Sequence, residues 1–280
     1  MGKPLAHKFS GVQEMQVDST QQFVDQLNWH SNQSTQALER LASGSRLLAP
    51  QDDAAGLAVS SRMKAKSRQL DAVANNIANG ISYTQTQDGF LKGAQEVLNR
   101  METLAIRAQD TTLSSGQRAL FQEEFRALKD TFNDLRTTQY NGRDLFNGKE
   151  LTITTSPEQR PLVSAGVDLF TSDINSVTAK TTHLDTPPDA QSALRVITQA
   201  SEQITQHRTG VGTALAGLQS AGNRLSNQRT NLLSALSRIS DADVATEATN
   251  LAKSKANLQI GIYSIKQGNT SNSHLSNLLG

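Results

Sequence analysis

The stretch that decides the fold is residues 197–239, ITQASEQITQHRTGVGTALAGLQSAGNRLSNQRTNLLSALSRI. Every seventh residue in it is leucine, isoleucine or valine: Ile197, Ile204, Val211, Leu218, Leu225, Leu232 and Ile239. Alanines recur three positions further on, at Ala200, Ala214, Ala221 and Ala235. A strict seven-residue period keeps an apolar seam facing a partner helix when the helices supercoil left-handedly. The stretch therefore predicts one helix of a coiled-coil rod, roughly 65 Å long at 1.5 Å per residue, in preference to a single globular core helix. Asp189, which follows Pro187 and Pro188, is expected to begin this helix, so that the helix spans about residues 189–239.

A partner helix is predicted over about residues 54–109, where the same period returns. Its row is Met63, Leu70, Ile77, Thr84, Leu91, Leu98 and Ala105. Asparagines and Gly80 weaken the middle of this row. A third helix is expected over about 117–138, where three phenylalanines at helical spacing favour a packing face over a cofactor site. Ser114, three residues before Gln117, predicts a capping box at its start.

An acidic pair, Asp52 and Asp53, follows the break at Gly44 and Pro50. Carboxylates in this position could be metal ligands or catalytic groups. No histidine lies nearby, and a predicted helix begins immediately after them. Because carboxylates stabilise the positive end of a helix, capping is the preferred interpretation.

The two ends of the chain carry thinner apolar rows. The first row is Phe23, Leu27, Ser34, Leu38 and Leu41, and the second is Val244, Ala248, Leu251, Lys255, Leu258, Ile262 and Ile265. Such helices are marginal alone, so we expect them to order on contact with other subunits. Leu275, Leu278 and Leu279 close the chain on an apolar tail.

The sequence pattern changes in the middle of the chain, at residues 143–188, where the helical period is lost. Asn147-Gly148 is expected to be the turn of a tight hairpin leading into Leu151–Ile153. The prolines and threonines after it are typical of exposed turns with little core. Antiparallel pairing of the rods would place both termini at one end and this segment at the other, so it is expected to be dispensable for assembly.

Composition narrows the class of protein. The chain has 27 basic and 26 acidic residues, no cysteine and only 4% aromatic residues. This balance offers no basic patch for nucleic acid, and the lack of cysteine excludes disulfides and thiolate metal sites. No window is apolar enough to span a membrane, and the first ten residues do not form a secretory signal.

An enzymatic function is not expected, and no cofactor or metal is predicted. The histidines are His7, His30, His183, His207 and His274. They share neither a metal-ligand nor a catalytic-triad spacing, and no phosphate-binding glycine motif occurs. His207 falls on the small-residue row of the last rod, where a polar residue commonly sets the register.

Four short segments resemble the bacterial flagellin family. They are ERLASGSR at 39–46, DDAAG at 52–56, GIS at 80–82 with QT at 85–86, and SRISDAD at 237–243 with ATE at 245–247. The resemblance covers about residues 30–147 and 190–280. Residues 1–17 depart from the family pattern, and the chain is expected to be about ten residues longer there than in the family.

The resemblance implies a mainly α fold of long antiparallel rods and three parts. Residues 1–54 and 241–280 would form an inner tube, and residues 55–240 would be the rod domain with a loop region at 143–188. The implied inner-tube contacts are Leu27, Leu38, Leu41, Leu251, Leu258, Ile262 and Ile265.

The resemblance also implies function and partners. The chain would be a structural subunit of the flagellar filament, an extracellular homopolymer that meets junction and cap proteins. It would leave the cell through the flagellar type III export apparatus, with an export chaperone at its C-terminus. Arg100, Leu104 and Glu124 match a surface that a Toll-like receptor recognises in many flagellins. The alternative is a hook–filament junction protein, which would carry a proline after the acidic pair, where this chain has Ala54.

Overall fold

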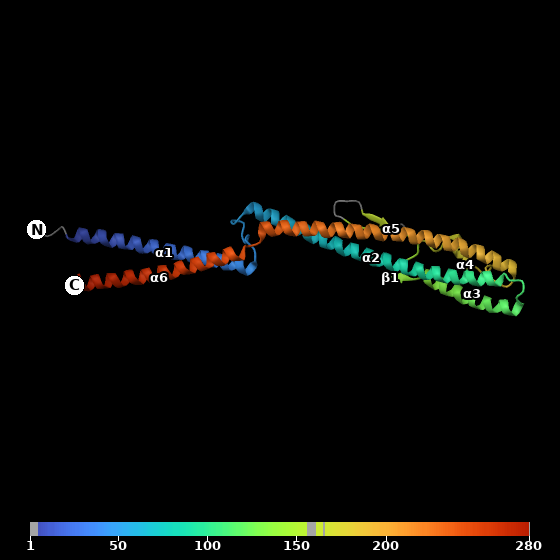
Figure 1. Ribbon diagram of the computed structural model, residues 1–280. Coiled ribbons are helices and arrows are strands. Elements are labelled where there is room, and N and C mark those ends of the chain that lie inside the picture. The colour runs from blue at the N-terminus through green and yellow to red at the C-terminus, as the bar shows by residue number, and fades with distance from the viewer. Residues whose placement is uncertain (1–4, 156–160, 165, 280) are drawn as a thin grey trace. The chain divides into compact units, whose positions relative to one another are not determined.

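The computed structural model describes the backbone of residues 5–155, 161–164 and 166–279, and the side chains of 21–155, 161–164, 166–271, 273 and 274. Its helices are α1 (Leu5–Ser43), α2 (Ala54–Ala108), α3 (Ser115–Arg136), α4 (Ser172–Thr178), α5 (Pro187–Ser240) and α6 (Val244–Leu279). Its strands are β1 (Gln139–Tyr140), β2 (Arg143–Asp144), β3 (Leu151–Ile153) and β4 (Leu162–Ser164). The predicted mainly α fold is confirmed (Figure 1). None of the described helices is long and apolar enough to serve as a membrane span.

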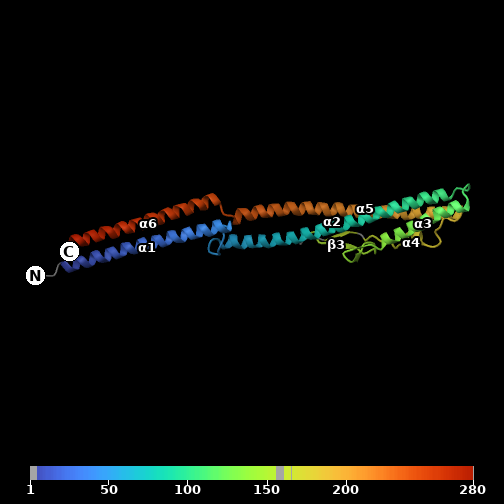
Figure 2. The same cartoon turned by 90° about the horizontal axis from the view of Figure 1, so that it is seen from below.

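The chain divides into a terminal unit, Met1–Ala65 with Leu232–Gly280, and a rod unit, Lys66–Asn231. In the terminal unit α1 packs along α6 (Figure 1). In the rod unit α2 and α5 lie side by side with α3 and α4 (Figures 1 and 2). The side chains of Leu275, Leu278 and Leu279, expected to form an apolar tail, lie outside the described residues, as does that of His7.

Within the rod unit α2 and α5 are antiparallel, as predicted. Polar pairs across the two helices fix the direction: Asp71 with Arg229 at 2.8 Å, Asp88 with Arg208 at 3.0 Å, and Gln95 with Ser201 at 2.5 Å. The seam between them is buried at Leu70, Ile77, Leu91, Leu98, Ile197, Ile204, Val211, Leu218 and Leu225. The last two residues of the predicted row, Leu232 and Ile239, lie in the terminal unit and are half-buried.

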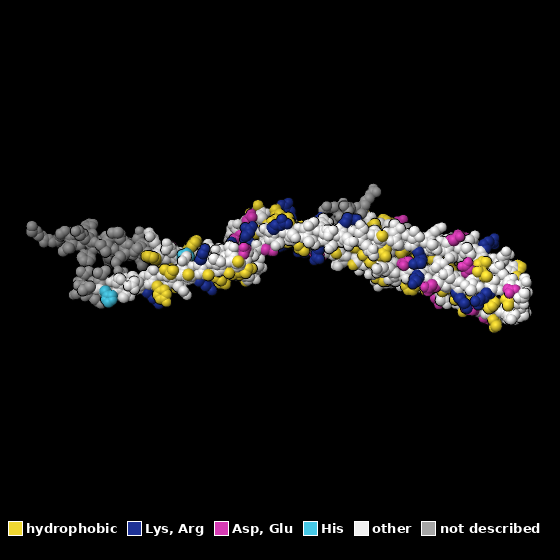
Figure 3. Space-filling view, viewed as in Figure 1, with side chains coloured by type: hydrophobic (Ala, Val, Ile, Leu, Met, Phe, Trp, Pro, Cys, Tyr) yellow, Lys and Arg dark blue, Asp and Glu magenta, His cyan; other side chains and the backbone are white. Residues whose placement is uncertain are grey.

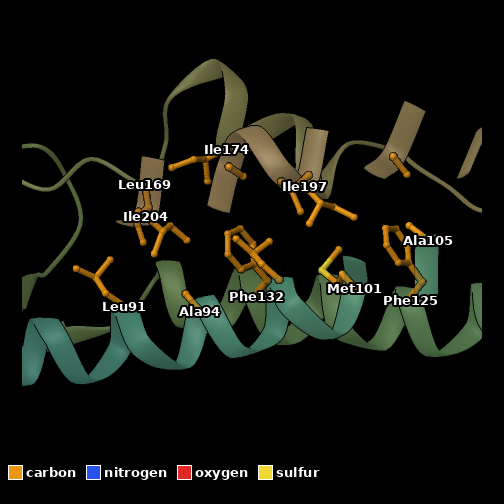
Figure 4. Close-up of a cluster of buried hydrophobic side chains, with 14 of the residues drawn as sticks. Leu91, Ala94, Met101, Ala105, Phe125, Phe132, Leu169, Ile174, Ile197 and Ile204 are labelled. Atoms are coloured by element: carbon orange, nitrogen blue, oxygen red, sulfur yellow. The ribbon is translucent and has the colours of Figure 1, made fainter. Parts of the chain in front are cut away.

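The third helix, α3, completes the core of the rod unit. Figure 4 shows Phe125 and Phe132 of α3 beside Met101 of α2 and Ile197 of α5. The predicted capping box at its start is confirmed, because Ser114 Oγ accepts from Gln117 N–H and the Gln117 side chain accepts from Ser114 N–H.

The hairpin predicted at Asn147-Gly148 is wrong. The tight turn is Asn141-Gly142, where both residues have positive φ, and it joins β1 to β2. β3 pairs instead with β4, antiparallel, with Leu151 opposite Ser164. Gly148 also has positive φ, but its N–H donates to Val167 O, so this turn bridges two distant loop segments. Both Asn-Gly pairs turn the chain, and only the first has strand residues that can pair on both sides.

Residues 143–188 are not a tip without a core. Seven of their side chains are buried in the core of the rod unit: Leu145, Phe146, Val167, Leu169, Ile174, Val177 and Leu184. Buried polar side chains of the helices hold the segment in place. Gln87 Nε2 donates to Leu145 O at 2.7 Å, and Leu184 N–H donates to Gln122 Oε1 at 2.6 Å. The expectation that this segment is exposed with little core is therefore corrected: it packs along the helices and covers part of their core, which removes the ground for expecting it to be dispensable.

Candidate assembly surfaces

The terminal unit contains a clasp, formed by residues 40–56 and 239–247, where the two passages of the chain between helices meet. Arg46 N–H donates to Ser240 O at 2.7 Å, and Ala242 N–H donates to Gly44 O at 2.9 Å. Ser45 Oγ adds a bond to Ser240 O at 3.1 Å. Gly44 directly follows α1 with φ +68°, the left-handed conformation in which glycine commonly ends a helix. These bonds fix where the chain leaves α1 relative to where it enters α6.

The two aspartates of the acidic pair have different partners within the clasp. Asp53 caps α2, because its Oδ1 accepts from Gly56 N–H at 2.8 Å, as predicted. Asp52 does not cap α2. Its Oδ2 accepts from the backbone N–H groups of Leu48 and Ala49, and its Oδ1 lies 3.2 Å from Arg40 Nη2. The backbone bonds from Ala49 and Leu48, assisted by Arg40, hold the pKa of the Asp52 carboxyl below its usual value.

Gly56 of the DDAAG segment has a steric reason to be glycine. A Cβ on Gly56 would lie 2.3 Å from Asp53 Oδ2 and 3.2 Å from Leu47 Cδ1. A side chain there would displace the Asp53 cap. Arg40 completes the clasp by reaching Glu247 Oε1 at 3.4 Å, which joins α1 to α6 across 207 residues of sequence.

The seam between α1 and α6 is thin. Among the described side chains of the two helices, at 21–43 and 244–274 without 272, the buried ones are small or polar: Ser34 and Ala37 on α1, and Glu247 and Ser254 on α6. Gly261 of α6 lies against Leu27 of α1, so closely that a Cβ there would be 2.7 Å from Leu27 Cδ2. Small residues bring the two helices close, and the pair buries little apolar surface on itself.

Large apolar side chains instead face outward from this helix pair (Figure 3). Trp29 is 58% exposed, Ile260 62% and Tyr263 70%. Phe23, Val24 and Leu48 are also exposed. Large apolar side chains that gather on an exposed face are typical of interaction sites.

The seven expected inner-tube residues fall into two groups. Leu38 and Ile262 are exposed, at 47% each. The other five are half-buried: Leu27, Leu41, Leu251, Leu258 and Ile265. The half-buried group is partly used within the pair, and the exposed group is open to a neighbour. The sequence-derived rows omitted Trp29, Ile260 and Tyr263, because a row drawn for one seam leaves out residues on the opposite helix face.

Two of the three residues expected to form the receptor surface are exposed, and the third is buried. Arg100 and Glu124 are both exposed and form an ion pair, with Arg100 Nη2 2.6 Å from Glu124 Oε1. Leu104 is fully buried in the core of the rod unit, so its assignment to the surface is corrected. It belongs to the buried cluster to which α2, α3 and α5 all contribute side chains.

The histidines are scattered here as in the sequence. His207 is half-buried, and burial lowers its pKa below the ordinary value, although the Asp168 backbone and carboxylate oppose this shift. His183 Nδ1 lies 3.2 Å from Asp185 Oδ2. Within the described part of the chain, no group of three or more histidine, aspartate or glutamate side chains could hold a metal ion.

The family models match the chain in two parts, one on either side of residues 151–193. Two sequence models of one family match, the bacterial flagellin N-terminal helical region over residues 18–150 and the C-terminal helical region over residues 194–279. The chain is 30% identical over 241 residues to a flagellin of Halalkalibacterium halodurans, and the matched region covers 85% of this chain and 89% of the relative. It is 31% identical over 266 residues to a flagellin of Listeria monocytogenes, and that match covers 88% of this chain and 91% of the relative.

Among solved structures, the fold is similar to that of a putative flagellar hook-associated protein from Vibrio parahaemolyticus. The TM-score is 0.60, and the match covers 68% of this chain and 100% of that chain. At 13% identity this likeness concerns the fold alone.

Proposed function

The chain belongs to the bacterial flagellin family, and from this membership we propose that its terminal helix pair supplies the contacts that build a flagellar filament. It is a structural subunit of that filament. The observation that carries the proposal is the outward-facing apolar surface of α1 and α6, formed by Trp29, Ile260 and Tyr263. A pair that buries so little against itself gains apolar burial only by packing against further copies.

The proposed inner-tube contacts separate by exposure. Leu38 and Ile262 contact neighbouring subunits, together with Trp29 and Ile260. Leu27, Leu41, Leu251, Leu258 and Ile265 serve mainly to pair α1 with α6. The rod seam, at Leu218 and its equivalents, holds α2 and α5 together within the rod unit.

The test removes outward apolar area without touching the seam. In the double variant Trp29→Ser and Ile260→Ser we expect a melting curve of the rod unit equal to that of the parent and no seeded filament growth. Val163→Ser is the matched control, because Val163 is 50% exposed on β4 in the rod unit. Electron microscopy and sedimentation give the readout. Normal filaments from the double variant would overturn the proposal.

Export and location follow from the same premise. We propose that the chain leaves the cell by the flagellar export apparatus, aided by an export chaperone at the C-terminus, and is extracellular. Its other partners are the junction and cap proteins of the flagellum. Family membership supports these statements. Deletion of the export apparatus should leave the chain inside the cell, which fractionation measures.

The exposed pair Arg100 and Glu124 is proposed as the receptor-facing or inter-subunit surface, without Leu104. Arg100→Asp reverses the charge on this surface and removes the ion pair, which is exposed and therefore contributes little to stability. We expect lower activation of a Toll-like receptor reporter with an unchanged melting temperature. Full activation by the variant would exclude a receptor role for this surface.

A further inference from the structure

A cavity of about 360 Å³ lies in the rod unit, apart from the surfaces proposed above. It opens between the middle of α2, the β1–β2 turn and β3. Its lining includes Asn76, Asn79, Tyr83, Tyr140 and Arg143. The volume lies in the lower part of the range for small-molecule sites. The asparagines that weaken the α2 seam in the sequence thus line a hollow.

The apolar wall of the cavity is built from two tyrosines. The rings of Tyr83 and Tyr140 meet edge to face, with centroids 5.7 Å apart. Both side chains are half-buried, and burial raises the pKa of the Tyr83 phenol, which keeps it neutral. Tyrosines held in this way present an apolar body together with a hydroxyl that can hydrogen-bond.

The rest of the wall is polar. Asn76 and Asn79 are exposed, and each amide offers two donors and an acceptor. Thr152 and Thr154 add hydroxyl groups from the β3 side. Ile153 lies between these threonines and is buried against Gly80, which closes the floor of the cavity.

Among the described residues that line the cavity, one carries a charge, Arg143. It is exposed, and no described carboxylate forms an ion pair with it. A guanidinium matches a carboxylate with two parallel hydrogen bonds. The cavity therefore combines an aromatic wall, neutral amide and hydroxyl groups, and one cation with no described partner.

We propose that this cavity binds a sugar that carries a carboxylate, with its pyranose ring against Tyr83 and Tyr140. The C–H face of a pyranose suits an aromatic wall, and its hydroxyl groups suit amides that both donate and accept. The carboxylate lies on Arg143. A neutral sugar makes the same ring contacts and lacks the charged one, so the site discriminates by charge.

The probes are galacturonate and galactose, which share a ring and differ at the carboxylate. Titration calorimetry or saturation-transfer NMR on the full-length monomer at low salt measures their affinities. We expect galacturonate to bind about tenfold more tightly, a ratio that falls at high salt because the contact is charged.

Arg143→Gln should abolish the preference for galacturonate and leave galactose unchanged. Arg143 is exposed, so this variant keeps the fold. Asn79→Ala, also exposed, should weaken both sugars. Arg195→Gln, an exposed arginine on α5, is the matched control and should behave as the parent. Equal affinities for the two sugars, equal losses from Arg143→Gln and Arg195→Gln, or no saturable binding below about 10 mM would each overturn the proposal.

Discussion

Gly80 is the residue at which the β3–β4 hairpin meets α2. A Cβ there would lie 2.4 Å from Ile153 Cδ1. We expect Gly80→Ala to destabilise the monomer by about 1–3 kcal/mol because the contact becomes overpacked. Thermal melts followed by circular dichroism measure the change. Ile153→Val removes Cδ1, so it should restore most of the loss in the double variant.

Gly89 provides the control on the same helix. Nothing lies within 4 Å of a Cβ built there. Gly89→Ala should therefore stabilise the helix by about 0.5–1 kcal/mol. A loss from Gly80→Ala that Ile153→Val does not relieve would mean that the hairpin does not pack on Gly80.

His207 predicts a dependence of stability on pH. Burial lowers its pKa in the folded chain below the ordinary 6.5, so the folded state favours the neutral ring. The unfolded state then binds more protons below about pH 6.5, and stability must fall as pH drops through that value. Melting temperatures at pH 7.5 and 5.5 should differ less in His207→Gln than in the parent. Gln206→Ala, at an exposed neighbour that does not titrate, should keep the parental difference.

At the scale of the element, Leu218 tests the rod seam. It is fully buried on α5, and its neighbour Gln219 is exposed. Leu218→Ala should cost about 2–5 kcal/mol. Leu218→Asp should abolish the cooperative melt, because a buried carboxylate without a partner costs several kcal/mol or must protonate. Gln219→Asp should melt like the parent. Equal melts of the two aspartate variants would place the seam elsewhere.

The middle segment gives a second test at this scale. Replacing residues 155–183 by a short Gly-Ser loop removes the buried Leu169, Ile174 and Val177. We expect a large fall in melting temperature and poor filament assembly. Ile174→Ala alone should cost about 2–5 kcal/mol. A replacement variant that melts and polymerises as the parent does would show that this layer adds no stability.

The elements divide into those that the sequence predicts and those that it does not. Periodicity located α2, α3 and α5 to within a few residues, because each carries a repeated apolar row over many turns. It missed α4, which spans only seven residues. The placement of the middle segment depends on contacts such as Gln122 with Leu184, which are polar and 62 residues apart. A local sequence pattern cannot predict a hydrogen bond between residues so far apart in the chain.

In the candidate surfaces, too, local features were predictable from the sequence and contacts between distant segments were not. DDAAG predicted a helix cap, and Asp53 provides it. The second role, that of Asp52 toward Arg40, requires knowing that α1 ends beside the start of α2. Leu104 was misplaced because the seam row counts one partner helix, whereas α2 also packs against α3. Burial on a helix with several neighbours cannot be read from a single row.

For the whole molecule, the two units should differ in resistance to proteolysis. The rod unit has a large apolar core, and the α1–α6 seam buries mainly small and polar residues. Segments with few buried apolar contacts open at low free energy. Limited proteolysis of dilute monomer should therefore trim both ends and leave a fragment of about residues 45–240. Assembled filaments should resist the same digestion. Equal protection of the ends in dilute monomer would contradict this expectation.

Because α1 pairs with α6, the first helix must wait for its partner during synthesis of the chain. α1 ends at Ser43 and α6 begins at Val244. At about 5–20 residues per second, a ribosome completes α1 roughly 10–40 s before it starts α6. During that interval Trp29 has neither its helix partner nor a neighbouring copy. The first helix of this protein is thus made early and gains its helix partner only near the end of synthesis. An apolar segment is exposed in the meantime, which gives a cellular factor that shields such segments its longest opportunity there.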